Sequence, residues 1–541
     1  MNSVEHIGYW KSVWLRFKRQ PWGICGLIIL SLFVLVALYA PFLSSSLPLC
    51  VVYDNQLFFP LFRYLVSSSF FTKKIDLFFN LLGLFFVPFL LTFFVEKTRR
   101  LWLQLAFGAL CIALFFLFGF YWTIDPALSK ELNVRRQSAY LELTADHSDL
   151  FHKRRRQVLP SWTFDLQYMN RYAILQLVVR QKNLELQHER LAGIMTHGAP
   201  YTLYQIQKEQ EDETIQNLKK ALQRGKKSYL ASLEQERELT RQLQKSPSEF
   251  MALEKRLRLL QEENSAYEEL ENRLQYIVDK RKWLQEQMKK ITFMLMPPIR
   301  QFHWEEDAGG EQALNLHLPF YEQTRTTRKD LVAALIFGSR ISLFVGFVST
   351  LISLAIGVFL GLVCGYYGGK VDIVLSRFVE VWESLPAFFM LLFIVTIMQT
   401  KSIFLIIAVI ALFSWTQGLR FVRAEVFRQR ELAYVDASKA LGFSDARILY
   451  SHILPNALLA VLALLPFDIM SAITREAGLA FLGLGEEQSC SWGVLMDEGR
   501  AAFPAESSLL WPPAIVLTVL LVAIAFVGEA LQRAMNPKTQ A

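Results

Sequence analysis

Eight stretches of this chain are apolar enough and long enough to cross a lipid bilayer, and they constrain the fold more than any other feature. A membrane-spanning helix needs roughly 20 mostly apolar residues, because each backbone polar group in the bilayer core must be bonded within the helix. The runs cover residues 22–41, 75–94, 101–122, 341–364, 375–398, 403–419, 457–479 and 511–527. We therefore predict an all-α, polytopic membrane protein with about eight transmembrane helices.

The placement of the basic residues predicts which side of the membrane each loop faces. Lysine and arginine precede the first run, separate the second run from the third and the sixth from the seventh, and follow the last. All of these positions fall on one side if eight helices alternate, and the positive-inside rule makes that side the cytoplasm. Both termini are then cytoplasmic. The net charge of +8 accordingly reflects topology in a lipid bilayer and implies no nucleic-acid partner.

Between the third and fourth apolar runs lies a strongly polar block with the periodicity of long helices. From residue 253 to residue 291, a mostly apolar stripe recurs at spacings of three and four, a coiled-coil pattern interrupted by Asn264 and Arg281. A second helix is predicted over 204–244, a third over 172–196, and Ser246-Pro-Ser-Glu249 marks the break between the two long ones. We predict an antiparallel helical hairpin with a third helix packed along it.

The side on which this polar block lies follows from helix parity. With eight crossings the block is outside the cytoplasm, whereas it is cytoplasmic if one of the two runs before it does not cross. The charges within the block do not decide between these alternatives, because long domains largely escape the positive-inside rule.

The chain thus divides into five consecutive segments. Residues 1–70 hold a basic amphipathic start, the first spanning helix and an outer segment, and residues 75–122 form a transmembrane hairpin. The coiled-coil block occupies 123–295, and residues 296–330 lead back to the membrane. Residues 331–541 supply five further spanning helices together with a polar loop over 420–455.

That polar loop has the residues of two short helices joined by a glycine. Residues 434–441 are good helix formers, and Gly442 suits the left-handed turn that ends a helix. Ser444 is placed to cap a second helix over 445–452, and Pro455 suits the first turn of the next spanning helix. A rigid helix lying across such a loop can transmit the motion of a soluble partner to the membrane helices.

This loop resembles the EAA coupling loop through which permeases of ABC importers contact their ATPase. The Glu-Ala-Ala triplet of the family pattern stands here as Asp436-Ala437-Ser438, and Gly442 follows after three residues. Aspartate keeps the negative charge of the family's glutamate on a shorter side chain. The segment closes with Ile453-Leu454-Pro455.

Further segments resemble the permeases of dipeptide and oligopeptide importers in particular. They cover residues 330–342, 365–372, 476–485 and 491–493, in the family's order and spacing. Residues 49–62 are most similar to the microcin C and oligopeptide importer branch. Members of this type have six spanning helices, so the resemblance makes 75–295 a large insertion into the first outer loop.

The resemblance implies an inner-membrane permease subunit of an ATP-driven importer of di- or oligopeptides, forming half of the translocation pore. It implies a second homologous permease, separate ABC ATPase subunits and an extracytoplasmic peptide-binding protein as partners. ATP hydrolysis then belongs to the ATPase, so the chain is no enzyme and needs no cofactor. The implied coupling residues are Asp436, Ala437, Ser438, Gly442, Ile453, Leu454 and Pro455.

Ionisable residues within the apolar runs are further candidates, because a charge in a bilayer is costly and usually faces protein or water. Asp468, Arg475 and Glu476 lie in the seventh run, with Asp468 and Arg475 on one helical face. They either line a path for peptides or form an intramembrane ion pair. Glu380 and Glu383 lie near the cytoplasmic start of the fifth run, beside Pro386, where a gating role and a structural role are both open.

The sequence lacks the common motifs of nucleotide-binding and metal-binding sites. GxxxxGK[ST], HExxH and CxxC spacings are all absent from the sequence, so neither a phosphate loop nor a metal site is predicted. Cys50 and Cys490 are both predicted near the outer face, which leaves a disulfide between them open. Two other function classes remain: a coiled-coil structural protein of the envelope on a degenerate permease scaffold, and a sensor gated through the coiled coil. The intact coupling loop argues against the first, and the second predicts no ATPase partner.

Overall fold

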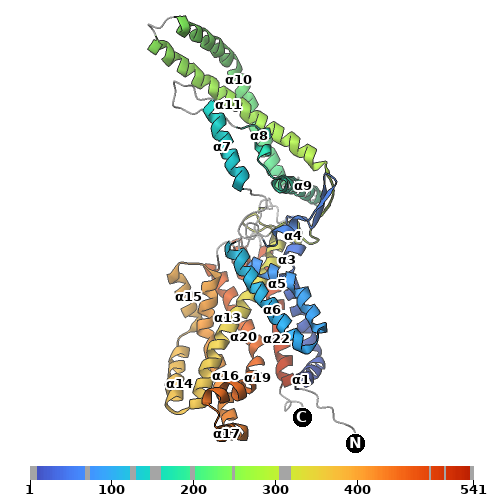
Figure 1. The fold of residues 1–541 in the computed structure, drawn as a ribbon, viewed down its shortest axis with the longest axis vertical. Helices are drawn as coiled ribbons and strands as arrows, with labels where there is room; N and C mark the ends of the chain where they lie inside the picture. The colour runs from blue at the N-terminus through green and yellow to red at the C-terminus, as the bar shows by residue number, and fades with distance from the viewer. Residues whose placement is uncertain are drawn as a thin grey trace.

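The computed structural model describes residues 9–66, 74–121, 130–146, 160–194, 202–245, 250–303, 307, 318–486, 489–504 and 507–535. Figure 1 shows an elongated molecule with a bundle of helices at one end and a long helical arm at the other. The bundle contains the apolar helices, and the arm contains the polar block.

Six helices of the bundle are long and apolar enough to cross a membrane, by length and composition. They coincide with six of the predicted runs and confirm an all-α polytopic membrane protein. These helices are α2 (Pro21–Leu38), α5 (Lys74–Leu91), α6 (Lys97–Phe116), α13 (Leu331–Tyr367), α16 (Ile403–Arg430) and α22 (Trp511–Met535). Shorter helices of the bundle are α1 (Tyr9–Lys18), α3 (Ala40–Leu43), α4 (Pro60–Tyr64) and α21 (Trp492–Ala501).

The other two predicted runs are each divided between two helices. The run 375–398 is divided between α14 (Gly369–Ser384) and α15 (Ala387–Met398), which meet at 74°. The run 457–479 is divided between α19 (Leu454–Leu462) and α20 (Leu465–Leu479). Each break comes just before a proline, Pro386 or Pro466, because proline lacks an N–H group and disfavours helical geometry in the residue before it.

The centre of the bundle is the close packing of α13 against α16. Gly357, Gly361 and Gly365 recur every fourth residue along α13 and face the backbone and valines of α16. Small residues at this spacing allow membrane helices to approach closely, and dispersion contacts then stabilise the pair. The close contact matters for function because α16 leads directly into the predicted coupling loop.

We expect Gly361→Leu to destabilise the bundle by about 1–3 kcal/mol, since a large side chain must be forced into a packed interface. A Cβ atom at Gly361 would lie 2.8 Å from Cβ of Val422 and 2.9 Å from the carbonyl oxygen of Leu419. The thermal unfolding midpoint of the detergent-purified protein measures the effect. Gly108→Leu in α6 is the matched control, because nothing lies within 4 Å of a Cβ atom there. Equal midpoints for the two variants would contradict the packing role.

Helix α5 is bonded into the same bundle through a buried arginine. The side chain of Arg340, in α13, is fully buried, and its Nη1 lies 2.8 Å from Oδ1 of Asp76 in α5. Nη2 of Arg340 donates to Oδ1 of Asn80 at 2.8 Å, and Nε donates to the carbonyl oxygen of Ala37 at 2.7 Å. Helix α5 therefore satisfies a charge in the centre of the bundle.

The arm is built on two long antiparallel helices, α10 (Leu203–Lys245) and α11 (Phe250–Met288), as the stripe predicted. The rings of Tyr229 and Tyr267 stack between them with centroids 4.2 Å apart. Asn264, which interrupts the stripe, is buried and donates to Oε2 of Glu236 at 2.6 Å. A polar residue in the stripe thus finds its partner on the facing helix. The predicted break at 246–249 lies outside the described residues.

In the lower part of the arm, Asp165 links three helices through its side chain. The third predicted helix is α9 (Arg171–Ile194), and α7 (Lys130–Asp146) and α8 (Trp162–Gln167) complete this part. Asp165 of α8 pairs with Arg136 of α7 at 2.8 Å and accepts a hydrogen bond from Tyr276 of α11 at 2.8 Å. Burial and this hydrogen bond raise the pKa of Tyr276 to about 12, so the phenol remains a donor at neutral pH.

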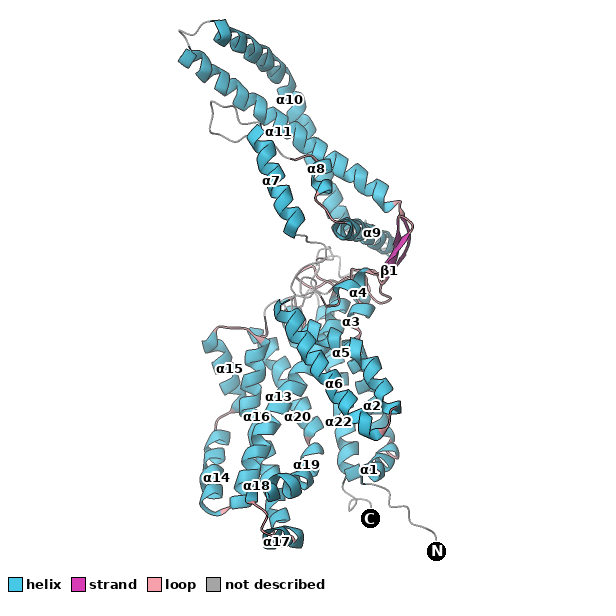
Figure 2. Ribbon diagram, in the orientation of Figure 1, coloured by secondary structure: helices cyan, strands magenta, loops and turns pink. Residues whose placement is uncertain are grey.

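A small antiparallel sheet at the base of the arm was not predicted from the sequence. Its strands are β1 (Cys50–Tyr53), β2 (Gln56–Phe58) and β3 (Ile291–Leu295), in the order β2-β1-β3 (Figure 2). The helix predicted to continue to residue 291 therefore ends at Met288, because Ile291 pairs with Tyr53 instead. Cys50 lies in β1, and the structure contains no disulfide between it and Cys490.

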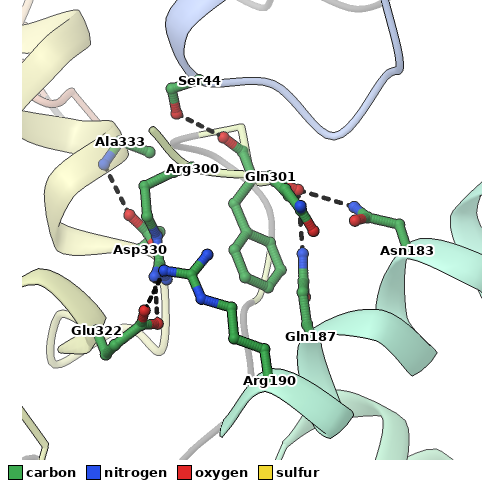
Figure 3. A network of polar contacts seen from close by, with 10 residues as sticks. Ser44, Asn183, Gln187, Arg190, Arg300, Gln301, Glu322, Asp330 and Ala333 are labelled. Carbon is green, nitrogen blue, oxygen red and sulfur yellow. Dashed lines mark hydrogen bonds and ion pairs between the residues drawn. The ribbon is translucent and has the colours of Figure 1, made fainter. Parts of the chain in front are cut away.

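Buried polar contacts fix α9 to the bundle, as Figure 3 shows. Asn183 and Gln187 both donate to the carbonyl oxygen of Gln301, at 2.8 and 3.1 Å. Arg190 of α9 and Arg300 both bind the carboxylate of Glu322. The arm thus reaches the segment that leads into α13.

The same network ends on the first turn of α13. Arg300 also binds Asp330, which caps α13 by accepting a hydrogen bond from the backbone N–H of Ala333 at 2.7 Å. Burial opposes the charge of Arg300, but Asp330 and Glu322 outweigh it and raise the pKa of the guanidinium. The arm and α13 are therefore joined by paired charged groups, of which Arg300, Glu322 and Asp330 are buried and Arg190 is 41% exposed. We name Arg190, Arg300, Glu322 and Asp330 the arm mount.

Candidate coupling surface and intramembrane cavity

The predicted coupling loop contains a short helix, α17 (Ala433–Ala440), that ends at a glycine. Gly442 has φ +78°, the left-handed region that glycine adopts readily. The N–H groups of Gly442 and Phe443 donate to the carbonyl oxygens of Lys439 and Ser438 at 2.9 and 3.2 Å. This pair of bonds is a Schellman motif, which explains why the helix ends in the predicted turn at Gly442.

The second helix of the loop differs from the prediction. Ser444 makes no side-chain capping bond, and α18 (Asp445–Arg447) continues as a π-helix over Ile448–Ile453 before α19 begins. Asp445 instead accepts a hydrogen bond from the hydroxyl of Tyr366 in α13 at 2.6 Å. The loop is therefore held to the end of α13 by Asp445, which has no distinguishing signal in the sequence.

Apolar residues seat the loop on the bundle. Val435 of α17, Ile448 and Ile453 are fully buried, and they pack with Val422 and Val426 of α16. Because α13 and α16 pack closely, α17 is attached to the central helix pair of the bundle. A force applied to α17 is therefore delivered to α13 and α16.

The opposite face of α17 is open. Asp436, Ala437 and Lys439 are exposed, and Leu441 is 73% exposed at the end of the helix. Ser438, the third member of the predicted triplet, is buried and donates to the carbonyl oxygen of Tyr434 at 2.8 Å. The predicted coupling residues thus differ in their exposure to solvent. Asp436, Ala437, Gly442 and Pro455 are exposed, Leu454 is partly buried, and Ser438 and Ile453 are buried.

A cavity of about 60 Å³ lies inside the bundle, between α13, α16 and α20. Each helix turns polar side chains toward it although the surrounding segments are apolar. The polar lining residues are Ser349, Thr350, Ser353, Ser414, Thr416, Gln417, Asp468, Ser471 and Arg475. The sequence analysis missed the hydroxyl residues, although their spacing on α13 places them on one helical face.

Asp468 and Arg475 both line this cavity, whereas Glu476 does not. Arg475 donates to Oγ of Ser414, and among the described residues no ion pair joins Arg475 to Asp468. Glu476 is 2% exposed and points elsewhere in the bundle. Of the three residues predicted together, the structure therefore brings two to one cavity.

Glu380 and Glu383 lie on α14, and Glu383 also lines a second hollow. Glu380 pairs with Arg377 at 2.6 Å, and Glu383 binds Arg420 of α16. Glu383, Thr416, Gln417, Arg420, Phe421 and Ala424 line a hollow of about 570 Å³. Thr416 and Gln417 line both spaces, so the cavity and the hollow adjoin along α16 in the direction of α17.

Metal chemistry finds no support in the described part of the chain, where no cluster of three metal-ligating side chains occurs. What the site offers is a rigid exposed helix joined to the bundle and a polar space within the bundle. These are the parts of a transport subunit: a surface for a driving partner and a route through apolar helices.

The chain belongs to the family of binding-protein-dependent transport permeases, and it is a multi-pass protein of the inner membrane. Residues 357–541 match the profile described as "Binding-protein-dependent transport system inner membrane component". Residues 8–57 match "N-terminal TM domain of oligopeptide transport permease C". The family predicted from the coupling loop is thereby confirmed. Its relatives are transport permeases rather than enzymes.

Individual relatives agree with this assignment. The inner membrane ABC transporter permease protein YejE of Escherichia coli is 34% identical over 269 residues, which cover 47% of this chain and 75% of that protein. The dipeptide transport system permease protein DppC of Haemophilus influenzae is 32% identical over 250 residues, covering 46% and 80%. The oligopeptide transport system permease protein OppC of the same organism is 35% identical over 216 residues, covering 40% and 69%.

Proposed function

We propose that this chain is the permease subunit of an ATP-driven importer of di- or oligopeptides and forms half of its translocation pore. The observation that carries the proposal is α17, a helix with one face seated on α13 and α16 and the other face open. The peptide substrate is supported by the names of the dipeptide and oligopeptide permeases to which the chain is similar. The chain itself then needs no cofactor, because a partner hydrolyses ATP.

The partners follow from this role. An ABC ATPase binds the open face of α17, a second homologous permease completes the pore, and an extracytoplasmic binding protein delivers the peptide. Asp436, Ala437 and Gly442 contribute the contact and its geometry, while Ile453, Leu454 and Pro455 connect it to α19. Glu383, at the hollow beside α16, and Glu380 on the same helix are proposed to gate the opening of the hollow through their arginine partners.

The proposed orientation places α17 and both termini in the cytoplasm and the arm outside. Figure 1 supports this, because α1, α17 and the end of α22 lie at one end of the molecule and the arm at the other. The segments 75–122 and 123–295 are then accessory domains inserted into the first outer loop, and 331–541 is the permease core with its coupling loop at 420–455.

Copurification tests the proposal. We expect the tagged wild-type protein, extracted in mild detergent, to bring down a second multi-span permease and a P-loop ATPase. Leu441→Asp is expected to lose most of the ATPase and to keep the permease, because it places a charge on an exposed apolar contact. Leu230→Asp is the matched control, since Leu230 is 54% exposed on the arm. An ATPase that is never recovered, or that is recovered equally with Leu441→Asp, would contradict the assignment of α17.

A further inference from the structure

We propose that the polar cavity between α13, α16 and α20 binds the two charged ends of a transported peptide. Arg475 takes the terminal carboxylate and Asp468 takes the terminal ammonium group. This inference rests on the proposed peptide-import function, and it assigns residues and a chemical selectivity to a site inside the membrane.

The first argument is that both charged side chains line the cavity and that no ion pair joins them among the described residues. An ionisable side chain within a membrane bundle is costly and requires a partner or water. Asp468 and Arg475 are seven positions apart in α20, which places their Cα atoms about 10 Å apart along the helix axis at 1.5 Å per residue. Within the described part of the chain, the carboxylate of Asp468 accepts no hydrogen bond and Arg475 bonds only to the hydroxyl of Ser414. Both groups thus retain unused hydrogen-bonding capacity toward the cavity.

The second argument is an unsatisfied hydroxyl on the opposite wall. Thr350 is 2% exposed, and its Oγ1 has no hydrogen-bond partner among the described residues. Thr350 lines the cavity next to Ser349 and Ser353 of the same helix. A buried polar atom without a partner is costly, and a polar guest that bonds to this hydroxyl would remove that cost.

The chemistry of the guest follows from the charges. The planar guanidinium group of arginine matches a carboxylate, and a carboxylate accepts from an ammonium group in charge-assisted hydrogen bonds. A peptide carries one of each at its two ends. At about 3.3–3.6 Å per residue, an extended chain of three residues spans roughly the separation of Asp468 and Arg475 along α20. The spacing therefore favours short peptides.

The available volume agrees with contacts to the ends of the peptide. A cavity of about 60 Å³ admits a terminal group but not a whole peptide. The adjoining hollow of about 570 Å³ shares Thr416 and Gln417 with it and lies within the size range of small-molecule sites. The charged ends thus bind in the cavity, and the rest of the peptide, its backbone included, is left to the larger hollow.

Uptake of blocked peptides tests the subsite in the complete transporter. The probes are trialanine, its C-terminal amide and its N-acetyl form, each at a concentration that saturates the binding protein. We expect Arg475→Gln to lower the uptake of trialanine about tenfold or more and to remove the preference for trialanine over the amide. Asp468→Asn is expected to remove the preference for trialanine over the acetylated form and to leave the preference over the amide intact. The binding protein is the same in every assay, so a change in these ratios reports on the permease.

Controls separate this selectivity from a structural role. Thr474→Val changes an exposed residue on the same helix that does not line the cavity, and it should keep all wild-type ratios. Arg475→Lys and Asp468→Glu keep the charges, so each should keep part of the preference for trialanine over the blocked peptides. These two variants still test the subsite if the neutral variants fail to assemble with the ATPase. Variants that lower the uptake of all three peptides equally, or that keep the wild-type ratios, would overturn the subsite. A wild-type transporter that assembles with its ATPase but takes up no peptide would overturn the proposed function instead.

Discussion

We expect Asp76→Ala to lower the free energy of unfolding by about 3–5 kcal/mol, because it leaves the guanidinium group of Arg340 buried without its counter-ion. The side chain of Arg340 is fully buried, and Asp76 is its ion-pair partner at 2.8 Å among the described residues. Asn80 and the carbonyl oxygen of Ala37 remain after the substitution, but they are neutral. The thermal unfolding midpoint and the yield of protein in the membrane fraction measure the loss.

Two further variants make this result specific to the buried charge. Glu131→Ala removes the acidic member of an ion pair with Arg135 whose side chains are 73% and 65% exposed, and such pairs contribute only about 0–1 kcal/mol. Asp76→Asn keeps an acceptor for Arg340 and is expected to fall between the wild type and Asp76→Ala. If Asp76→Ala and Glu131→Ala had equal midpoints, Asp76 would not be the group that stabilises Arg340.

Gly442→Val is expected to lower peptide uptake about tenfold or more while the protein still inserts in the membrane. At φ +78° a side chain with a Cβ atom costs roughly 1–2 kcal/mol, and a cost of 1.4 kcal/mol reduces a population tenfold. Nothing lies within 4 Å of a Cβ atom at Gly442, so the effect comes from the backbone turn and not from a clash. Uptake and the ATPase activity of the purified complex are measured together, and uncoupling appears as ATPase activity without transport.

Gly442→Asn is the graded control for this turn. Asparagine visits the left-handed region more readily than other residues with a Cβ atom, so it should keep most of the uptake that valine loses. If asparagine and valine were equally harmful, the side chain itself would disturb the ATPase contact. Wild-type uptake in both variants would show that the Schellman turn is not needed for coupling.

The sequence carried enough information for the spanning helices and the coupling loop because their signals are local. Apolar runs of sufficient length identify α2, α13 and α22, and good helix formers followed by glycine identify α17. The two breaks could also have been placed from local signals. Pro386 and Pro466 interrupt helices by their missing N–H groups, but both lie within strongly apolar runs, and the composition was given more weight.

Contacts between distant residues could not be read from one sequence. Asp76 and Arg340 are 264 residues apart, and each looks like an isolated charge at the edge of or within an apolar run. The strands β1 and β3 are each too short to stand out, and their pairing depends on the insertion returning to its own base. The sequence points to Asp468 and Arg475 together, but apart from Ser471 the hydroxyl residues that complete their cavity come from two other helices.

The arm mount makes the arm a lever on α13. Arg190 and Arg300 hold the base of the arm against Glu322 and Asp330, so a tilt of the first turn of α13 is carried into the arm as a whole. With 43 residues in α10, the arm extends about 60 Å, and a tilt of about 5° displaces its far end by about 5 Å. A tilt of this size in the first turn of α13 is thus magnified into a displacement wider than a helical backbone, far from the bundle.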